Sequence, residues 1–185
     1  MDGVIPWTTW LLVPFLIWVV VSDILFRRIA NRLILLMLLI WSVVTLAHLV
    51  IAAGEGGLAE ALSHLGHAVV GAIVVLVVGF LLFQMGQVGG GDVKLIVMLC
   101  LWLGQGEQWV FVIMTSLIGG VMVLGLPLLY RAEVGLARAW QSVSRRLALN
   151  WPTPLVLTEH RPQGLPYGLA IVAGAFYTLF VHIYY

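Results

Sequence analysis

The stretch QVGGGDVKLIVMLCLWLG, residues 87–104, decides which fold the sequence predicts. Three glycines lead into Asp92, and a mostly apolar run of twelve residues, 93–104, follows that aspartate. As a helix the run would be about 18 Å long at 1.5 Å per residue, whereas the hydrocarbon core of a bilayer is about 30 Å thick. The number of membrane crossings therefore depends on whether this short run is one of them.

The chain as a whole is too apolar for a soluble domain. Of its 185 residues, 62% are hydrophobic and 9% are charged, whereas soluble domains carry about 25% charged residues. Helices are expected, because lipid cannot pair the open edge of a sheet. Five further stretches are long and apolar enough to span a bilayer: 7–26, 33–53, 67–85, 109–130 and 165–184. The sequence predicts an all-α polytopic membrane helix bundle that forms a single domain over residues 1–185.

The basic residues resolve the role of the short run, because Lys and Arg concentrate in cytoplasmic loops. If 93–104 crosses the membrane, all nine basic residues fall on one side. If it does not cross, the five arginines from Arg131 to Arg161 lie opposite the other four basic residues. We therefore predict six transmembrane helices, both termini outside, and a cytoplasmic loop over 131–163. A fourth helix this short requires local thinning of the bilayer or shelter by its neighbours.

The predicted cytoplasmic loop has a helical pattern of its own. Leu136, Trp140, Val143 and Leu147 recur at helical spacing and share one face. Such a face predicts a helix lying on the membrane surface, and a plain connector helix is the alternative. The segment Trp151-Pro152-Thr153-Pro154 is expected to end that helix.

Two carboxylates fall at the predicted cytoplasmic face. Asp23 lies near the end of the first span, and Asp92 lies at the start of the fourth. Ionisable groups in such segments are candidates for function, and two neighbouring carboxylates share one proton. One can then act as a base on water while the other, as an acid, hydrogen-bonds the scissile carbonyl, as in aspartic proteases. The residues alone leave open that Asp92 is a helix N-cap and that Asp23 pairs with Arg27.

Other site chemistries find little support. The sequence contains no H-E-x-x-H or G-x-S-x-G motif, and GGGDVK lacks the spacing of a phosphate loop. The single cysteine, Cys100, excludes a four-cysteine zinc site. Glu60, His64 and His67 could share a helical face on the outer side, either as metal ligands or as solvated interfacial residues. We expect neither a metal nor another cofactor.

Three segments resemble, in the same order, the motifs of the type IV prepilin peptidase family. Gly89-Gly90-Gly91-Asp92 matches the G-x-G-D signature of intramembrane aspartyl proteases, and GGGDVKL resembles the prepilin peptidases in particular. The segment DILFRRIANRL, residues 23–33, resembles the family's first aspartate motif, D-x-x-x-R-x-I-P-N, with Ala30 in place of the usual proline. GLPYGLAI, residues 164–171, resembles the Pro-Tyr-Gly segment that opens the family's last helix.

The resemblance implies a membrane aspartic endopeptidase of the bacterial inner membrane that removes the leader of prepilins at the cytoplasmic face. It makes Asp23 and Asp92 the catalytic pair. The residues expected to line the substrate cleft are Gly89, Gly90, Gly91, Pro166, Tyr167 and Gly168. Those expected to give electrostatic support are Arg27, Arg28 and Lys94. The expected partners are a prepilin and the lipid bilayer, with no nucleic acid.

Longer members of the family carry an N-terminal extension with paired CxxC motifs and also N-methylate the pilin. This chain has one cysteine and begins almost directly at the segment with Asp23, so it resembles the short, peptidase-only form of tight-adherence (Flp) pilus systems. One alternative is a bifunctional peptidase that also N-methylates the pilin. Others are a small transporter or channel subunit that uses the aspartates as a proton relay, and a non-catalytic membrane scaffold. Transport would require a polar path, whereas Thr45, His48, Thr115 and Ser116 are scattered.

Overall fold

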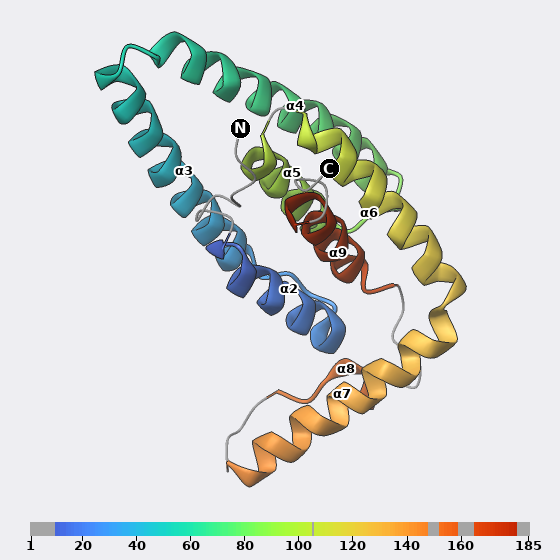
Figure 1. Ribbon diagram of the computed structural model, residues 1–185. Helices are drawn as coiled ribbons and strands as arrows, with labels where there is room; N and C mark the ends of the chain where they lie inside the picture. Colours follow the sequence, from blue (N-terminus) through green and yellow to red (C-terminus); the bar gives the residue numbers. More distant parts are fainter. Residues whose placement is uncertain (1–9, 105, 148–151, 159–164, 181–185) are drawn as a thin grey trace.

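The computed structural model describes residues 10–104, 106–147, 152–158 and 165–180, and all regular structure within these ranges is helical. The helices appear in Figure 1 as α2 (Val13–Phe26), α3 (Asn31–Gly54), α4 (Leu58–Gln84), α5 (Gly90–Leu103), α6 (Glu107–Leu124), α7 (Leu126–Arg146), α8 (Leu155–Thr158) and α9 (Tyr167–Phe180). The predicted all-α class is therefore confirmed.

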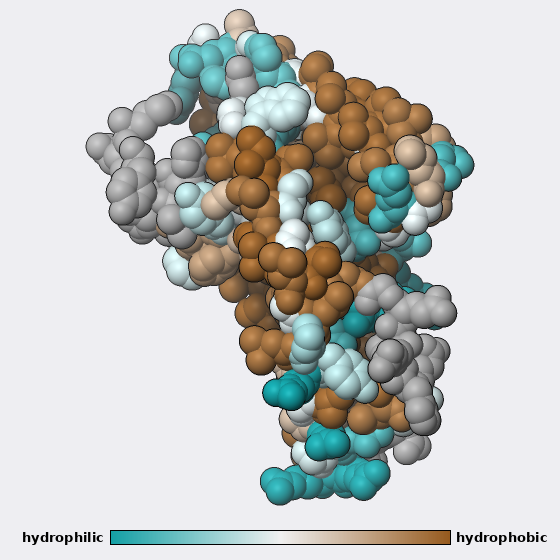
Figure 2. All heavy atoms as spheres, turned by 90° about the vertical axis from the view of Figure 1, so that its right-hand side faces the viewer, coloured by the Kyte–Doolittle hydropathy of each residue, from teal (hydrophilic) through white to brown (hydrophobic). Residues whose placement is uncertain are grey.

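Three of these helices, α3, α4 and α6, are long and apolar enough to cross a membrane. Helices α2 and α9 are shorter but also apolar. Large apolar side chains such as Leu39, Val77 and Leu117 point outward from the long helices and are more than half exposed. Figure 2 shows apolar residues over much of the upper body and hydrophilic residues gathered at the lower end, where α7 lies. This surface suits lipid around the bundle, and the six-span count stays a prediction.

The short run that follows Asp92 forms the central helix of the bundle. Helix α5 packs against α3, α4, α6 and α9. Leu95, Leu99 and Cys100 are completely buried among these neighbours. On α4, Gly79 makes room for α5, because a Cβ at Gly79 would lie 2.8 Å from Cγ1 of Val93. Helix α5 is thus short because its neighbours shelter it.

Helices α6 and α9 approach each other closely through small residues. A Cβ at Gly174 of α9 would lie 2.9 Å from the backbone nitrogen of Thr115 on α6. A Cβ at Gly119 of α6 would lie 2.8 Å from Cε2 of Tyr167 at the start of α9. Glycines at helix contacts allow this closeness in membrane proteins. The packing fixes the start of α9, which carries Tyr167 and Gly168.

The bounds of three predicted spans differ from the structure. Within the first, 7–26, residues 11 and 12 form a turn, and α2 begins at Val13. The predicted span 109–130 ends at Leu124, because Gly125 ends α6 and a proline in the next turn begins a new helix, α7. Helix α4 begins at Leu58, nine positions before the predicted start at 67. Residues 58–66 contain a glutamate and a histidine, so the apolar run that predicts a membrane span begins only at 67.

The predicted surface helix is the later part of α7, which runs beneath the end of α2 in Figure 1. Its predicted apolar face is split. Trp140 turns inward and packs edge-on against Phe26 of α2, with ring centroids 6.1 Å apart. Leu136, Val143 and Leu147 are exposed. Residues 148–151 lie outside the described residues, but α7 ends at Arg146, before the predicted break.

Candidate active site

A cleft of about 1100 Å³ opens where α2 ends and α5 begins, and both Asp23 and Asp92 line it. Its walls come from the end of α2, the connection to α3, the turn before α5 and the start of α9. Asp23 is buried and Asp92 is partly buried. The fold therefore brings together two carboxylates that the sequence placed at one membrane face from separate segments.

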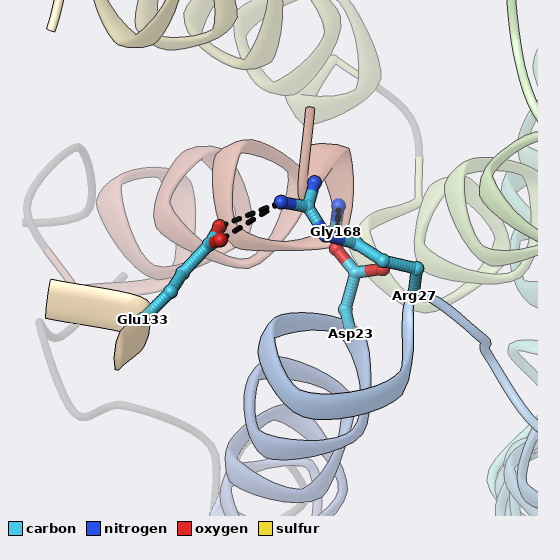
Figure 3. Close-up of polar contacts among 4 residues, drawn as sticks. All are labelled: Asp23, Arg27, Glu133 and Gly168. Carbon is cyan, nitrogen blue, oxygen red and sulfur yellow. Dashed lines mark hydrogen bonds and ion pairs between the residues drawn. The ribbon is translucent and has the colours of Figure 1, made fainter. Parts of the chain in front are cut away.

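Both the side chain and the backbone of Asp23 accept hydrogen bonds. Its Oδ2 accepts a 2.8 Å hydrogen bond from the backbone N–H of Gly168, and its carbonyl oxygen accepts a 2.9 Å hydrogen bond from the N–H of Arg27. Figure 3 shows Gly168 of α9 directly above the Asp23 carboxylate. A Cβ at Gly168 would lie 2.8 Å from that Oδ2, so only glycine fits here without displacement. Pro166 is fully buried just before this contact.

Asp92 lies in the first turn of α5 and is not its N-cap. Gly89 occupies the N-cap position, and no side chain caps the helix there. The Asp92 carboxylate folds back toward Gly89. Its Oδ2 is so close to this glycine that an added Cβ would lie only 2.7 Å away. This places the carboxylate near the positive end of the helix dipole.

The next two glycines allow close packing around Asp92. A Cβ at Gly90 would lie 3.3 Å from the ring of Phe83 on α4, and a Cβ at Gly91 would lie 3.4 Å from Cβ of Ile29. Gly89, Gly90 and Gly91 all line the cleft. Of the C-terminal motif, Tyr167 lines the cleft and Gly168 contacts Asp23.

The three cations predicted to support the site all line the cleft but differ in their contacts. Arg27 forms an ion pair with Glu133, with its Nη2 2.8 Å from Oε1 and 2.9 Å from Oε2. Arg28 is exposed. Lys94 is also exposed, and its Nζ donates a 3.2 Å hydrogen bond to Oδ1 of Asn31. Arg27 therefore forms its ion pair with Glu133 of α7. The sequence had left open an i, i+4 ion pair with Asp23 instead.

Glu133 is the residue of this site that sequence reasoning missed. It lies in α7, is 3% exposed, and reaches the Arg27 guanidinium as Figure 3 shows. The one signal in the sequence is that Glu133 is the only acidic residue in a stretch with four arginines, 126–146. That pattern alone does not indicate which distant residue it would contact.

The histidines of α4, His64 and His67, form no metal centre. His64 Nε2 lies 3.7 Å from Glu60 Oε1, both side chains are exposed, and Nδ1 of His67 contacts the backbone oxygen of Ser63 at 2.7 Å. Within the described ranges, no three His, Cys, Asp or Glu side chains are grouped so that they could hold a metal ion.

Comparison with protein-family models matches residues 10–126 to the type IV leader peptidase family. No curated protein and no solved structure matches the chain. The matched segment exceeds half of the chain and contains both Asp23 and Asp92 with the helices that carry them. The family suggested by the three sequence motifs is confirmed, and the chain belongs to the type IV leader peptidase family.

Proposed function

We propose that the protein is an aspartic endopeptidase that removes the leader peptide of type IV prepilins at the cytoplasmic membrane face. The family indicates a peptidase that acts on leader peptides. The observation that carries the aspartic mechanism is that Asp23 and Asp92, from two different helices, line one cleft. A pair of carboxylates that shares one proton is sufficient to activate water for peptide hydrolysis.

The proposed reaction needs one ionised and one protonated carboxyl group. The ionised aspartate takes a proton from a water molecule while the water oxygen bonds to the scissile carbonyl carbon. The protonated aspartate gives its proton to the carbonyl oxygen. In the second step the carbon–nitrogen bond of the tetrahedral intermediate breaks, and the departing amine takes up the proton that the first aspartate had received. One hydroxyl group of the intermediate returns its proton to the second aspartate, which leaves a carboxylic acid and restores the starting pair. The two aspartates titrate as a pair, so the structure alone assigns neither role.

The position of the cleft supports a substrate that combines a polar leader with an apolar helix. The cleft lies at the ends of apolar helices, and its wall includes the exposed cations Arg28 and Lys94. The glycines at 89–91 carry no side chains that would keep a substrate backbone away. We assign the substrate to the Flp-like prepilins, because the chain has one cysteine and resembles the short, peptidase-only form.

The proposed location is the bacterial inner membrane, with six spans, both termini outside and the cleft on the cytoplasmic side. This topology collects all nine basic residues on the side of the cleft. A prepilin leader in the cytoplasm would then meet Asp23 and Asp92 without crossing the bilayer.

The experiment that tests the function is cleavage of a candidate Flp-like prepilin by the purified protein in liposomes. Asp23→Asn and Asp92→Asn, tested separately, should each abolish cleavage while membrane insertion stays normal. Glu55→Gln is the matched control, because Glu55 is an exposed carboxylate at the far end of α3. Cleavage at the wild-type rate by either aspartate variant would exclude the two-aspartate mechanism.

A further inference from the structure

Helix α7 buries the one acidic residue that it contains. The helix carries four arginines, and most of its surface is exposed, yet Glu133 is 3% exposed. A buried carboxylate is costly unless a cation pairs with it. The cation is Arg27 of the α2 terminus, whose Nη2 lies 2.8 and 2.9 Å from the two Glu133 oxygens. The pair therefore connects α7 to the segment that carries Asp23.

Arg27 adopts a backbone conformation that arginine rarely takes. Its φ is 50° and its ψ is 35°, and it is the one non-glycine residue with positive φ in the described part of the chain. Glycine or asparagine usually occupies this left-handed position after a helix. A conformation of this kind persists where surrounding contacts impose it. The Arg27–Glu133 ion pair is such a contact, and the Arg27 N–H also holds the Asp23 carbonyl oxygen.

The conformation brings the Arg27 side chain over Asp23. Figure 3 shows this side chain running past the Asp23 carboxylate toward Glu133. Two carboxylates therefore compete for one guanidinium group. Arginine binds a carboxylate strongly through two parallel hydrogen bonds, which would occupy both oxygens of Asp23 and disfavour its protonated form, so Asp23 could not share a proton with Asp92.

We propose that Glu133 is a positioning residue for the peptidase reaction, which holds the Arg27 guanidinium on the α7 side of Asp23 and so keeps Asp23 available to water. The proposal rests on the proposed function, because it assigns Asp23 to the catalytic pair. Glu133 itself acts through Arg27. Helix α7 thereby contributes to the site without supplying a group that reacts.

The test is a double-mutant cycle on prepilin cleavage, with kcat and KM measured for each protein. Glu133→Gln keeps the shape of the side chain and removes its charge, so Arg27 should close onto Asp23. We expect kcat to fall about 10- to 100-fold with little change in KM. Adding Arg27→Asn removes the competing cation, and asparagine tolerates the left-handed conformation. The double variant should therefore cleave faster than Glu133→Gln, which a purely structural role of Glu133 would not produce.

Arg138→Gln is the matched control, because Arg138 is an exposed residue of the same helix, and it should cleave at the wild-type rate. Thermal unfolding in detergent checks the fold of each variant. If Glu133→Gln does not fold, the variant with both Glu133→Gln and Arg27→Asn provides the test. Cleavage by this double variant within about tenfold of wild type supports the proposal. A double variant that folds but does not cleave overturns it.

Two other results separate this proposal from the proposed function. Wild-type kcat in folded Glu133→Gln, or a double variant no faster than the single one, would overturn the role of Glu133. The function would still stand if the two aspartate variants are inactive. A wild-type protein that cuts no prepilin would overturn both.

Discussion

The backbone N–H of Gly168 donates a 2.8 Å hydrogen bond to Oδ2 of Asp23, and thereby joins the start of α9 to the last turn of α2. The two residues come from opposite ends of the chain. The contact fixes the orientation of the first aspartate through a backbone group, which no side-chain substitution at a neighbouring residue can replace.

Replacing Gly168 by alanine should therefore impair the site directly. The new Cβ would lie 2.8 Å from the Asp23 oxygen and 3.1 Å from its Cβ, so either the carboxylate or α9 must move. We expect prepilin cleavage to fall by about 100-fold, because displacement of a catalytic group by about 1 Å has effects of this size. Gly135→Ala is the control, because a Cβ at that position of α7 meets nothing within 4 Å. Equal cleavage by the two variants would contradict the assigned role of Gly168.

The adjacent glycines of α6 offer an internally matched test of the α6–α9 contact. A Cβ at Gly119 would lie 2.8 Å from the Tyr167 ring, whereas one at Gly120 meets nothing within 4 Å. Gly119→Ala should lower the free energy of unfolding by about 1–3 kcal/mol, the usual cost of overpacking. Gly120→Ala should be neutral or slightly stabilising, because alanine favours the helix. Thermal unfolding of the two variants in the same detergent measures the difference, and a similar loss in both would argue against close packing at Gly119.

A substitution of Gln108 should lower the stability of the protein without changing its activity. Its buried Nε2 donates hydrogen bonds of 2.8 Å to the carbonyl oxygen of Ala68 and 2.9 Å to that of Cys100, and so joins α6 to α4 and α5. Gln108→Leu leaves these carbonyl groups without that donor and should destabilise the protein by about 1–3 kcal/mol. Gln108 does not line the cleft, so we expect kcat of the folded variant to stay close to that of wild type. A large fall in kcat without a change in unfolding would show that this end of the bundle influences the cleft.

The topology can be tested without any substrate. Six spans with an outside N-terminus place the C-terminus outside as well. A reporter fused after residue 185 that is active only outside the cytoplasm should therefore show activity. The same reporter inserted in the predicted cytoplasmic loop, after Arg146, should be inactive. A cytoplasmic C-terminus would exclude the six-span count, while leaving the two-aspartate cleft as a separate question.

Much of the fold could be predicted because composition and charge act over whole segments. The all-helical class follows from the apolar composition, and the helices around 33–53 and 93–104 were placed within a few residues of α3 and α5. The sequence predicts that Asp23 and Asp92 lie at the same membrane face, and in the structure both line one cleft.

What the sequence could not indicate depends on tertiary contacts. Hydropathy missed the break at Gly125 because the flanking residues are equally apolar on both sides, although the glycine and the proline two residues later are both signals of a helix end. The sequence indicates no partner for Glu133, since only the fold brings Arg27 to it. The contact between Gly168 and Asp23 likewise requires α9 to pack beside α2.

The break at Gly125, after which α7 begins, also fixes the side of α7 on which Glu133 lies. Each residue turns an α-helix by about 100°, so a single insertion or deletion between Gly125 and Glu133 would swing the carboxylate to another side of the helix. Arg27 would then lose its partner on α7, although every residue of the site was still present. Beyond Arg146, by contrast, added residues do not change the side on which Glu133 lies. The number of residues between Gly125 and Glu133 therefore matters to this site as much as the identity of those two residues.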